Sequence, residues 1–69
     1  MEFHLKENED HIPLNLLLKV TQLVGTGGEA NIRIENGEVQ VNGEVEFRKR
    51  NKLRSGDEIV FQKQVIKIV

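Results

Sequence analysis

The chain has 69 residues, no cysteine and a formal net charge of −1. A chain of this length forms one small domain with a compact core, and without cysteine it can build neither disulfides nor cysteine-based zinc sites. Its N-terminal stretch lacks the basic and apolar regions of a signal peptide, and no apolar run is long enough to span a bilayer. We therefore expect a soluble, cytoplasmic protein in which residues 1–69 form a single domain.

The first third of the chain predicts one helix. Residues 2–5 favour a short strand, which a polar loop follows. Pro13 suits the first turn of a helix, where its missing N–H would have no intrahelical partner. Between residues 14 and 24 most side chains are apolar, and the polar ones are spaced to share one face. The pattern predicts a largely buried helix that Gly25 ends, with a polar stripe of Asn15, Lys19 and Gln22.

A second helix is predicted in the stretch TGGEANIRIENG. Thr26 and Glu29 have the spacing of a capping box, in which side chain and backbone satisfy each other's exposed donors. Ala30 and Ile34 lie four residues apart and share a face directed at the core. Gly37 follows as a left-handed terminator.

After Gly37 the period of the apolar residues changes from helical to two. Valines alternate with polar residues on both sides of Asn42-Gly43, and this pair is the strongest short signal for a β-hairpin because both central residues need positive φ. The alternation continues to Phe47 and directs its ring inward. Residues 39–47 therefore predict a hairpin.

Two more strands are predicted at the C-terminal end. They are EIVF, at residues 58–61, and VIKIV, at residues 65–69, and they are joined through Gln62-Lys63-Gln64. Alternation again directs a ring, that of Phe61, inward. Two helices followed by four short strands place the chain in the α+β class.

Charge is distributed unevenly along the chain. Residues 1–47 hold three basic and nine acidic residues, which gives −6, and residues 48–69 hold seven basic and two acidic residues, which gives +5. Five of the cations lie in RKRNKLR, residues 48–54. In an extended chain Arg48, Arg50, Lys52 and Arg54 would project to one side and Leu53 to the other.

Such a stretch has two interpretations. Lysines on an edge strand protect a sheet against strand addition, but one or two suffice for that. Five cations within seven residues repel one another, and the arginine fork suits phosphate oxygens. With Phe47 and Phe61 expected inside, stacking on single-stranded bases is not expected, so the affinity for a nucleic acid would come from phosphate contacts.

Enzymatic function receives little support from the residues. The two histidines lie in the N-terminal segment, Ser55 is the only serine and lies in a turn, and the chain has no cysteine nucleophile. The run VGTGGEA lacks the Gly-Lys-Ser/Thr ending of a phosphate-binding loop. The acidic residues before Pro13 are typical of a solvated run. We expect no catalytic residue, no metal and no cofactor.

From residue 17 to residue 57 the chain resembles the RNA-binding domain named after small-subunit ribosomal protein S-four, also called the alpha-L RNA-binding motif. The similarity is greatest to small stand-alone bacterial proteins of the YaaA and YbcJ type, and the motif core covers about residues 13–58. It rests on the lysine of the first helix, the run TGGEA, and V-x-V-N-G-E followed by R and K-L-x-x-G-D.

The resemblance implies two helices packed on a small curved antiparallel sheet, and structured RNA, such as ribosomal or transfer RNA, bound along the helix pair and the basic loop. Residues that match the family's contacts, or add charge beside them, are Lys19, Arg33, Arg48, Lys49, Arg50, Lys52 and Arg54. Contacts to the RNA backbone are expected at Thr26, Gly27, Gly28 and Asn31. The family usually has a basic residue in place of Asn31. Arg33 either substitutes for that contact or pairs with Glu29.

Two other functions stay open. The chain could be a protein-interaction adaptor whose basic loop docks an acidic partner, or a weak binder of DNA. A monomer is expected, with the ribosome or another protein as a further partner.

Overall fold

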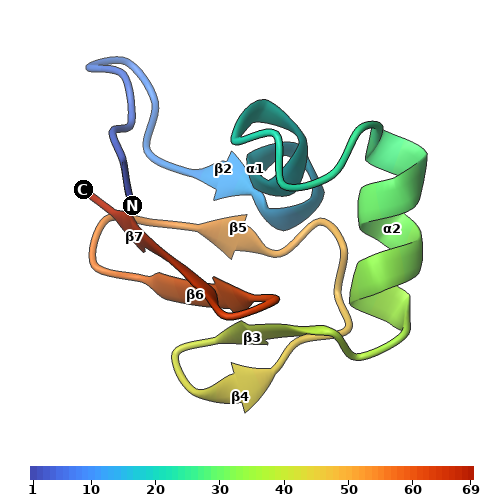
Figure 1. Cartoon of the computed structure of the whole chain (residues 1–69). Helices are drawn as coiled ribbons and strands as arrows, with labels where there is room; N and C mark the ends of the chain where they lie inside the picture. Colours follow the sequence, from blue (N-terminus) through green and yellow to red (C-terminus); the bar gives the residue numbers. More distant parts are fainter.

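The computed structural model describes residues 1–69 in full. In chain order the elements are β1 (Glu2–Phe3), β2 (Ile12–Pro13), α1 (Leu14–Val20), α2 (Gly27–Glu35), β3 (Val39–Val41), β4 (Glu44–Val45), β5 (Lys52–Leu53), β6 (Glu58–Phe61) and β7 (Gln64–Ile68). The helices lie together beside the strands, and α2 lies at the end of the molecule opposite the two termini (Figure 1). Neither helix is long and apolar enough to cross a bilayer.

The strands form two sheets. The larger has the order β1-β7-β6-β3-β4, and β2 pairs with β5 in a separate antiparallel pair. All neighbours in the larger sheet are antiparallel except β1, which pairs in parallel with β7. The predicted α+β class is confirmed. The prediction of a wholly antiparallel sheet was wrong, because the short N-terminal strand pairs in parallel with β7 and makes the sheet mixed.

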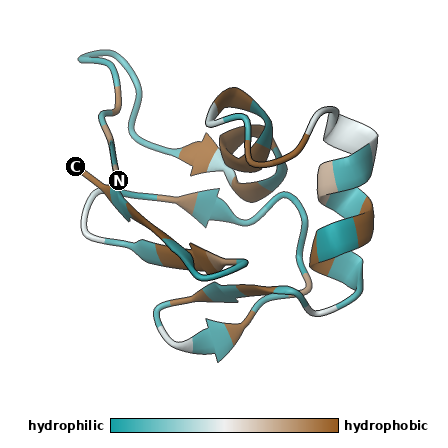
Figure 2. Cartoon of the chain, in the orientation of Figure 1, coloured by the Kyte–Doolittle hydropathy of each residue, from teal (hydrophilic) through white to brown (hydrophobic).

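A single apolar cluster holds the helices against both sheets. All 13 buried residues are hydrophobic, so no charge needs a buried partner. The helices contribute Leu14, Leu17 and Ile34, among others, and α1 is the most continuously hydrophobic element in Figure 2. Leu16 and Val20, however, are exposed, so α1 buries less of its surface than its composition predicts.

Helix α1 ends earlier than the predicted Gly25. Thr21 is its C-cap, and Gln22 takes a left-handed conformation with φ 63°. The N–H of Gln22 donates to the carbonyl of Lys19 and the N–H of Leu23 to that of Leu18, which is the bond pattern of a Schellman motif. The sequence carries no signal for this end, because glutamine rarely adopts the left-handed region.

Helix α2 has the predicted caps. The Thr26 hydroxyl accepts a hydrogen bond from the N–H of Glu29 at 3.0 Å, and Gly37 follows the C-cap with φ 78°. The Glu29 carboxylate differs from an ideal capping box, because it accepts from the N–H of Gly25 rather than that of Thr26.

The two tight turns of the larger sheet differ in residue type. Asn42 and Gly43, with φ of 53° and 85°, confirm the predicted turn between β3 and β4. Gln62 and Lys63, with φ of 50° and 65°, make the same kind of two-residue turn between β6 and β7. The predicted connection is therefore one residue too long, since the third residue belongs to β7.

The residue types in the turn between β6 and β7 predict that a substitution there will stabilise the protein. Residues with a Cβ are strained at positive φ, so Q62N/K63G should raise the free energy of unfolding by about 1 kcal/mol. Urea unfolding followed by circular dichroism measures the change.

The matched control is G43A in the other turn. A Cβ at Gly43 meets no atom within 4 Å, so the substitution introduces no steric clash. The only cost is the strain of an alanine at positive φ, which should lower the free energy of unfolding by about 1 kcal/mol. A lower unfolding midpoint for Q62N/K63G would contradict the assignment of strain to the second turn.

Candidate nucleic-acid interface

The cationic stretch forms a turn and a short strand, and we call residues 48–54 the basic loop. The N–H of Asn51 donates to the carbonyl of Arg48 at 3.1 Å, which reverses the chain at Lys49 and Arg50. The next two residues then form β5 against β2. The prediction of an extended segment with four cations on one side was wrong, because the turn interrupts the alternation.

The basic loop is docked on the N-terminus of α1. The first-turn N–H groups of Leu14 and Asn15 donate to the loop carbonyls of Asn51 and Lys49, each at 2.9 Å. Pro13 precedes them and no side chain caps this helix, so the loop backbone supplies the acceptors that a helix start requires. Leu53 is fully buried, as its opposite parity predicts.

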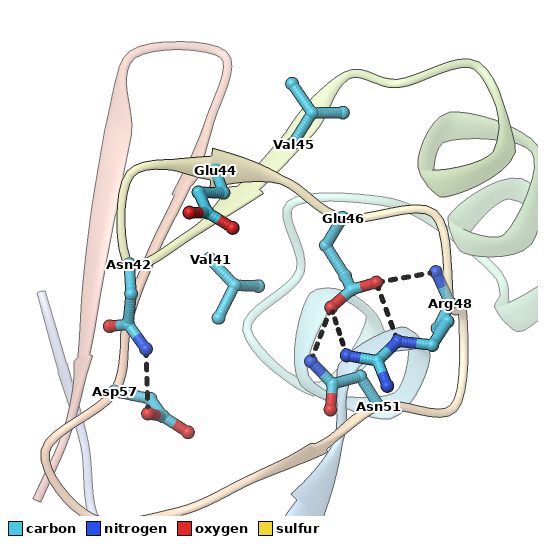
Figure 3. A pocket seen from close by; sticks show the side chains of 8 residues that line it. All are labelled: Val41, Asn42, Glu44, Val45, Glu46, Arg48, Asn51 and Asp57. Atoms are coloured by element: carbon cyan, nitrogen blue, oxygen red, sulfur yellow. Dashed lines mark hydrogen bonds and ion pairs between the residues drawn. The ribbon is translucent and has the colours of Figure 1, made fainter.

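The carboxylate of Glu46 braces the first half of the basic loop through hydrogen bonds. Glu46 accepts hydrogen bonds from the backbone N–H of Arg48 at 2.9 Å, from its guanidinium at two atoms at 3.1 Å, and from the Asn51 amide at 2.8 Å (Figure 3). These bonds from Arg48 lower the pKa of the Glu46 carboxyl, and the ionised Glu46 raises the pKa of Arg48. The Glu46 side chain is only 14% exposed, while that of Arg48 is 77% exposed.

A second carboxylate braces the end of the loop. Asp57 accepts from the backbone N–H of Arg54 at 2.8 Å and from the amide of Asn42 at 3.0 Å. It lines the same shallow hollow of about 430 Å³ as Glu46 (Figure 3). Sequence reasoning assigned neither acid a role. Their signal was their place in the N-G-E-x-E-x-R and G-D parts of the family pattern.

Several candidate cations carry an acidic partner. Lys49 lies 3.2 Å from Glu35, and Arg54 lies 3.4 Å from Asp10. Arg33 contacts two carboxylates, those of Glu29 and Glu38, at 3.5 and 3.2 Å. Exposed pairs of this kind contribute about 0.2–1 kcal/mol each, so a phosphate can replace the carboxylate at little cost.

Three candidate cations make no ion pair. They are Lys19, Arg50 and Lys52, and all three are exposed. Arg50 lies in the turn of the basic loop, Lys52 at the start of β5, and Lys19 in the last turn of α1. Their charge is available to a ligand without the loss of an existing bond.

Four residues near the start of α2 were predicted to contact the RNA backbone, and two of them already bond within the protein. Asn31 accepts a hydrogen bond from the Asn15 amide at 3.0 Å, which links α2 to α1. Gly27 and Gly28 belong to the first turn of α2, where an N–H has no intrahelical acceptor. The Thr26 hydroxyl is already engaged as the cap. The structure thus places Asn31 between the helices and the two glycines at the helix entrance.

Phe47 is the clearest departure from the predicted pattern. Strand β4 ends at Val45, and Phe47 is 60% exposed, whereas Phe61 is 1% exposed as predicted. The last bond to the sheet joins the N–H of Glu46 to the carbonyl of Val39. Phe47 was therefore wrongly predicted to point inward, because the chain leaves the sheet before the alternation reaches it.

The N-terminal acidic run does not form a metal site. No three His, Cys, Asp or Glu side chains come together in an arrangement that could hold a metal ion. Asp10 instead lies 2.7 Å from the His11 ring and also contacts Arg54. The hydrogen bond to His11, followed by the charge of Arg54, lowers the pKa of the Asp10 carboxyl.

The bracing role of Glu46 predicts a stability change that depends on pH. E46Q should lower the free energy of unfolding at pH 7 by about 1–2 kcal/mol, since it weakens charge-assisted bonds to Arg48. A carboxyl with a lowered pKa contributes its stability fully above the ordinary value of 4.5 and loses it as the pH falls through the folded-state pKa. The difference between wild type and E46Q should therefore shrink below about pH 4.5.

Urea unfolding at several pH values measures this difference. E44Q is the matched control, because Glu44 is an exposed carboxylate in the neighbouring strand β4. It should leave stability nearly unchanged. Equal effects of E44Q and E46Q at pH 7 would show that Glu46 does not brace the loop.

Comparison with known proteins places the chain in a family. A family model described as the S4 domain matches residues 3–69. YbcJ of Escherichia coli (strain K12) and YbcJ of Shigella flexneri are each 37% identical to the chain over 59 residues, which cover 86% of this chain and 84% of each relative. The solution structure of Escherichia coli YbcJ superposes with a TM-score of 0.74 at 35% identity and covers 99% of this chain and 85% of that one. That structure is described as containing an alfa-L motif involved in RNA binding. The predicted resemblance is confirmed, and the chain belongs to the S4 domain family.

Proposed function

We propose that this chain is a non-enzymatic protein that binds structured RNA through phosphate contacts from the basic loop and the helix pair. The observation that carries the proposal is the basic loop itself. Its backbone is fixed on the N-terminus of α1 while its charged side chains point to solvent. A chain of the same family, Escherichia coli YbcJ, has a motif described as involved in RNA binding.

The unpaired cations make the first contacts in this proposal. Arg50 and Lys52 bind phosphates without giving up a protein partner, and Lys19 extends the footprint along α1. Lys49 and Arg54 follow by exchanging an exposed carboxylate for a phosphate. Arg48 binds a phosphate while it keeps its bond to Glu46. Arginine can bind two phosphate oxygens at once, which favours it over water and over a single carboxylate oxygen.

The helix pair makes weaker contacts with the RNA than the basic loop does. Asn31 and Asn15 already bind each other, and Arg33 is held between Glu29 and Glu38. Gly27 and Gly28 offer backbone N–H groups at the start of α2, where an anion is favoured by the helix dipole. The helix pair therefore orients the bound RNA more than it attracts it by charge.

The proposal includes a target class and a setting. Folded ribosomal or transfer RNA presents the closely spaced phosphates that five clustered cations match. The site residues supply charge and backbone donors rather than a nucleophile and its base, which supports a role in binding and not in catalysis. We propose that the protein acts as a monomer in the cytoplasm, with the ribosome as a candidate partner.

Salt dependence tests the electrostatic mechanism. If about five phosphates are neutralised, log K should fall with log salt concentration at a slope of roughly −3.5 to −4.5. R50Q/K52Q should make the slope shallower by about 2, because two phosphate contacts are removed. Filter binding to a folded RNA at several salt concentrations measures both slopes.

K63Q/K67Q is the matched control. It removes the same charge from the turn between β6 and β7 and from β7, outside the basic loop. It should leave the slope near that of the wild type. Equal losses for both double variants would point to nonspecific attraction, and a preference for duplex DNA over RNA would contradict the proposed target.

Binding that survives nuclease treatment would support the adaptor alternative instead. In that case a pull-down with the wild-type protein should retain its partner after RNA is digested. If the protein instead holds its partner through RNA, digestion of the RNA should release that partner.

A further inference from the structure

Phe47 is an exposed aromatic residue directly beside the basic loop. The residue is 60% exposed, and the next residue is Arg48, the first cation of the loop. The chain has no tryptophan and no tyrosine, and its other phenylalanines are Phe3, which packs against the core, and Phe61, which is buried in it. Phe47 is therefore the only largely exposed aromatic ring, and it lies where the positive charge is concentrated.

The ring is supported on one side by backbone. It lies against Gly37, the left-handed residue that ends α2, where an added Cβ would be 3.2 Å from Phe47 Cε1. Val45, on β4, borders the same position. Because Gly37 has no Cβ, the ring approaches the end of α2 closely and has backbone on one side. A ring that already rests on backbone loses less conformational entropy when a flat partner stacks on it.

Two carboxylates close to the basic loop are paired with cations of the loop. Glu46 precedes Phe47 and is paired with Arg48. Glu35, in the last turn of α2, lies 3.2 Å from Lys49. Repulsion between these acids and an RNA strand is reduced, so a nucleotide can approach with its phosphate near the loop cations and its base near the ring.

We propose that the Phe47 ring is a stacking platform for an unpaired base of the bound RNA. The inference rests on the proposed function and narrows it, since the ligand becomes folded RNA with an accessible unpaired nucleotide and not an uninterrupted duplex. Bases in loops and bulges stack on aromatic side chains, whereas bases within an RNA helix are already stacked on each other. The cations bind the backbone of either RNA, and the ring distinguishes the two.

Single substitutions at position 47 test this inference against two RNAs with equal numbers of phosphates. One is a hairpin with an unpaired loop, and the other is a blunt duplex. F47A should weaken binding to the hairpin by about 5- to 150-fold, equivalent to about 1–3 kcal/mol for one stacked base, and leave duplex binding unchanged. The salt slope should not change, because the ring carries no charge.

Two further variants separate stacking from simple apolar contact. F47Y keeps an aromatic ring and should retain hairpin affinity, while F47L keeps apolar bulk without a π-face and should lose it as F47A does. V65A is the matched control, since Val65 is an exposed apolar residue on β7. Unchanged urea midpoints confirm that the variants fold.

Fluorescence gives a direct readout of the stacked state. F47W introduces a single indole into a chain without tryptophan or tyrosine, and stacking of a base on it should quench its emission on titration with the hairpin. V65W should not be quenched. The duplex should quench neither variant.

The outcomes separate this inference from the proposed function. If R50Q/K52Q weakens RNA binding but F47A and F47L do not, the basic loop binds RNA and the inference that Phe47 stacks on a base is overturned. If F47L binds the hairpin as the wild type does, or if F47W emission changes with protein concentration instead of with RNA, the ring serves an apolar protein contact and the inference is overturned. Absence of RNA binding by the wild type overturns both proposals.

Discussion

Two backbone hydrogen bonds, from the first turn of α1 to the carbonyls of Lys49 and Asn51, connect the fold to the candidate interface. A helix of seven residues is too short to be stable alone, and α1 has no side-chain cap to satisfy its first donors. The basic loop supplies those acceptors, and the burial of Leu53 keeps it in place. Helix and loop therefore stabilise each other, and the cations are positioned by the same contacts that complete the fold.

The same arrangement explains how a chain of net charge −1 can present a cationic surface. The two carboxylates that brace the basic loop, Glu46 and Asp57, bind it from below through backbone and side-chain donors. Glu46 is mostly buried while Arg48 extends into solvent. In this pair the acid faces the protein and the base faces solvent, so a cation is left on the surface. The bracing acids also offset the repulsion among neighbouring cations that would otherwise disfavour the loop.

Much of the fold could be predicted because it depends on local signals. The hairpin at Asn42-Gly43, the caps of α2 and the burial of Leu53 each follow from residue type and spacing. The early end of α1 at Gln22 and the turn at Lys49 have no such signal, since ordinary residues adopt these conformations only because neighbouring elements require them. In the candidate site, the clustering of cations in residues 48–54 is visible in the sequence. Their pairing could not be predicted, because Asp10 and Glu35 are distant from the loop in sequence and meet it only in the fold.

Phe47 shows why an alternation rule fails at the end of a strand. The rule assigns inward and outward positions only while the backbone stays in the sheet. Here the last ladder bond is made by Glu46, and the next residues must leave the sheet to reach the start of α1. The residue at the point of departure is no longer constrained by the pleat, so its ring rests on the end of α2 and faces solvent. The segment that leaves the sheet after Glu46 exposes the ring and then enters the basic loop, which is why aromatic surface and positive charge lie next to each other.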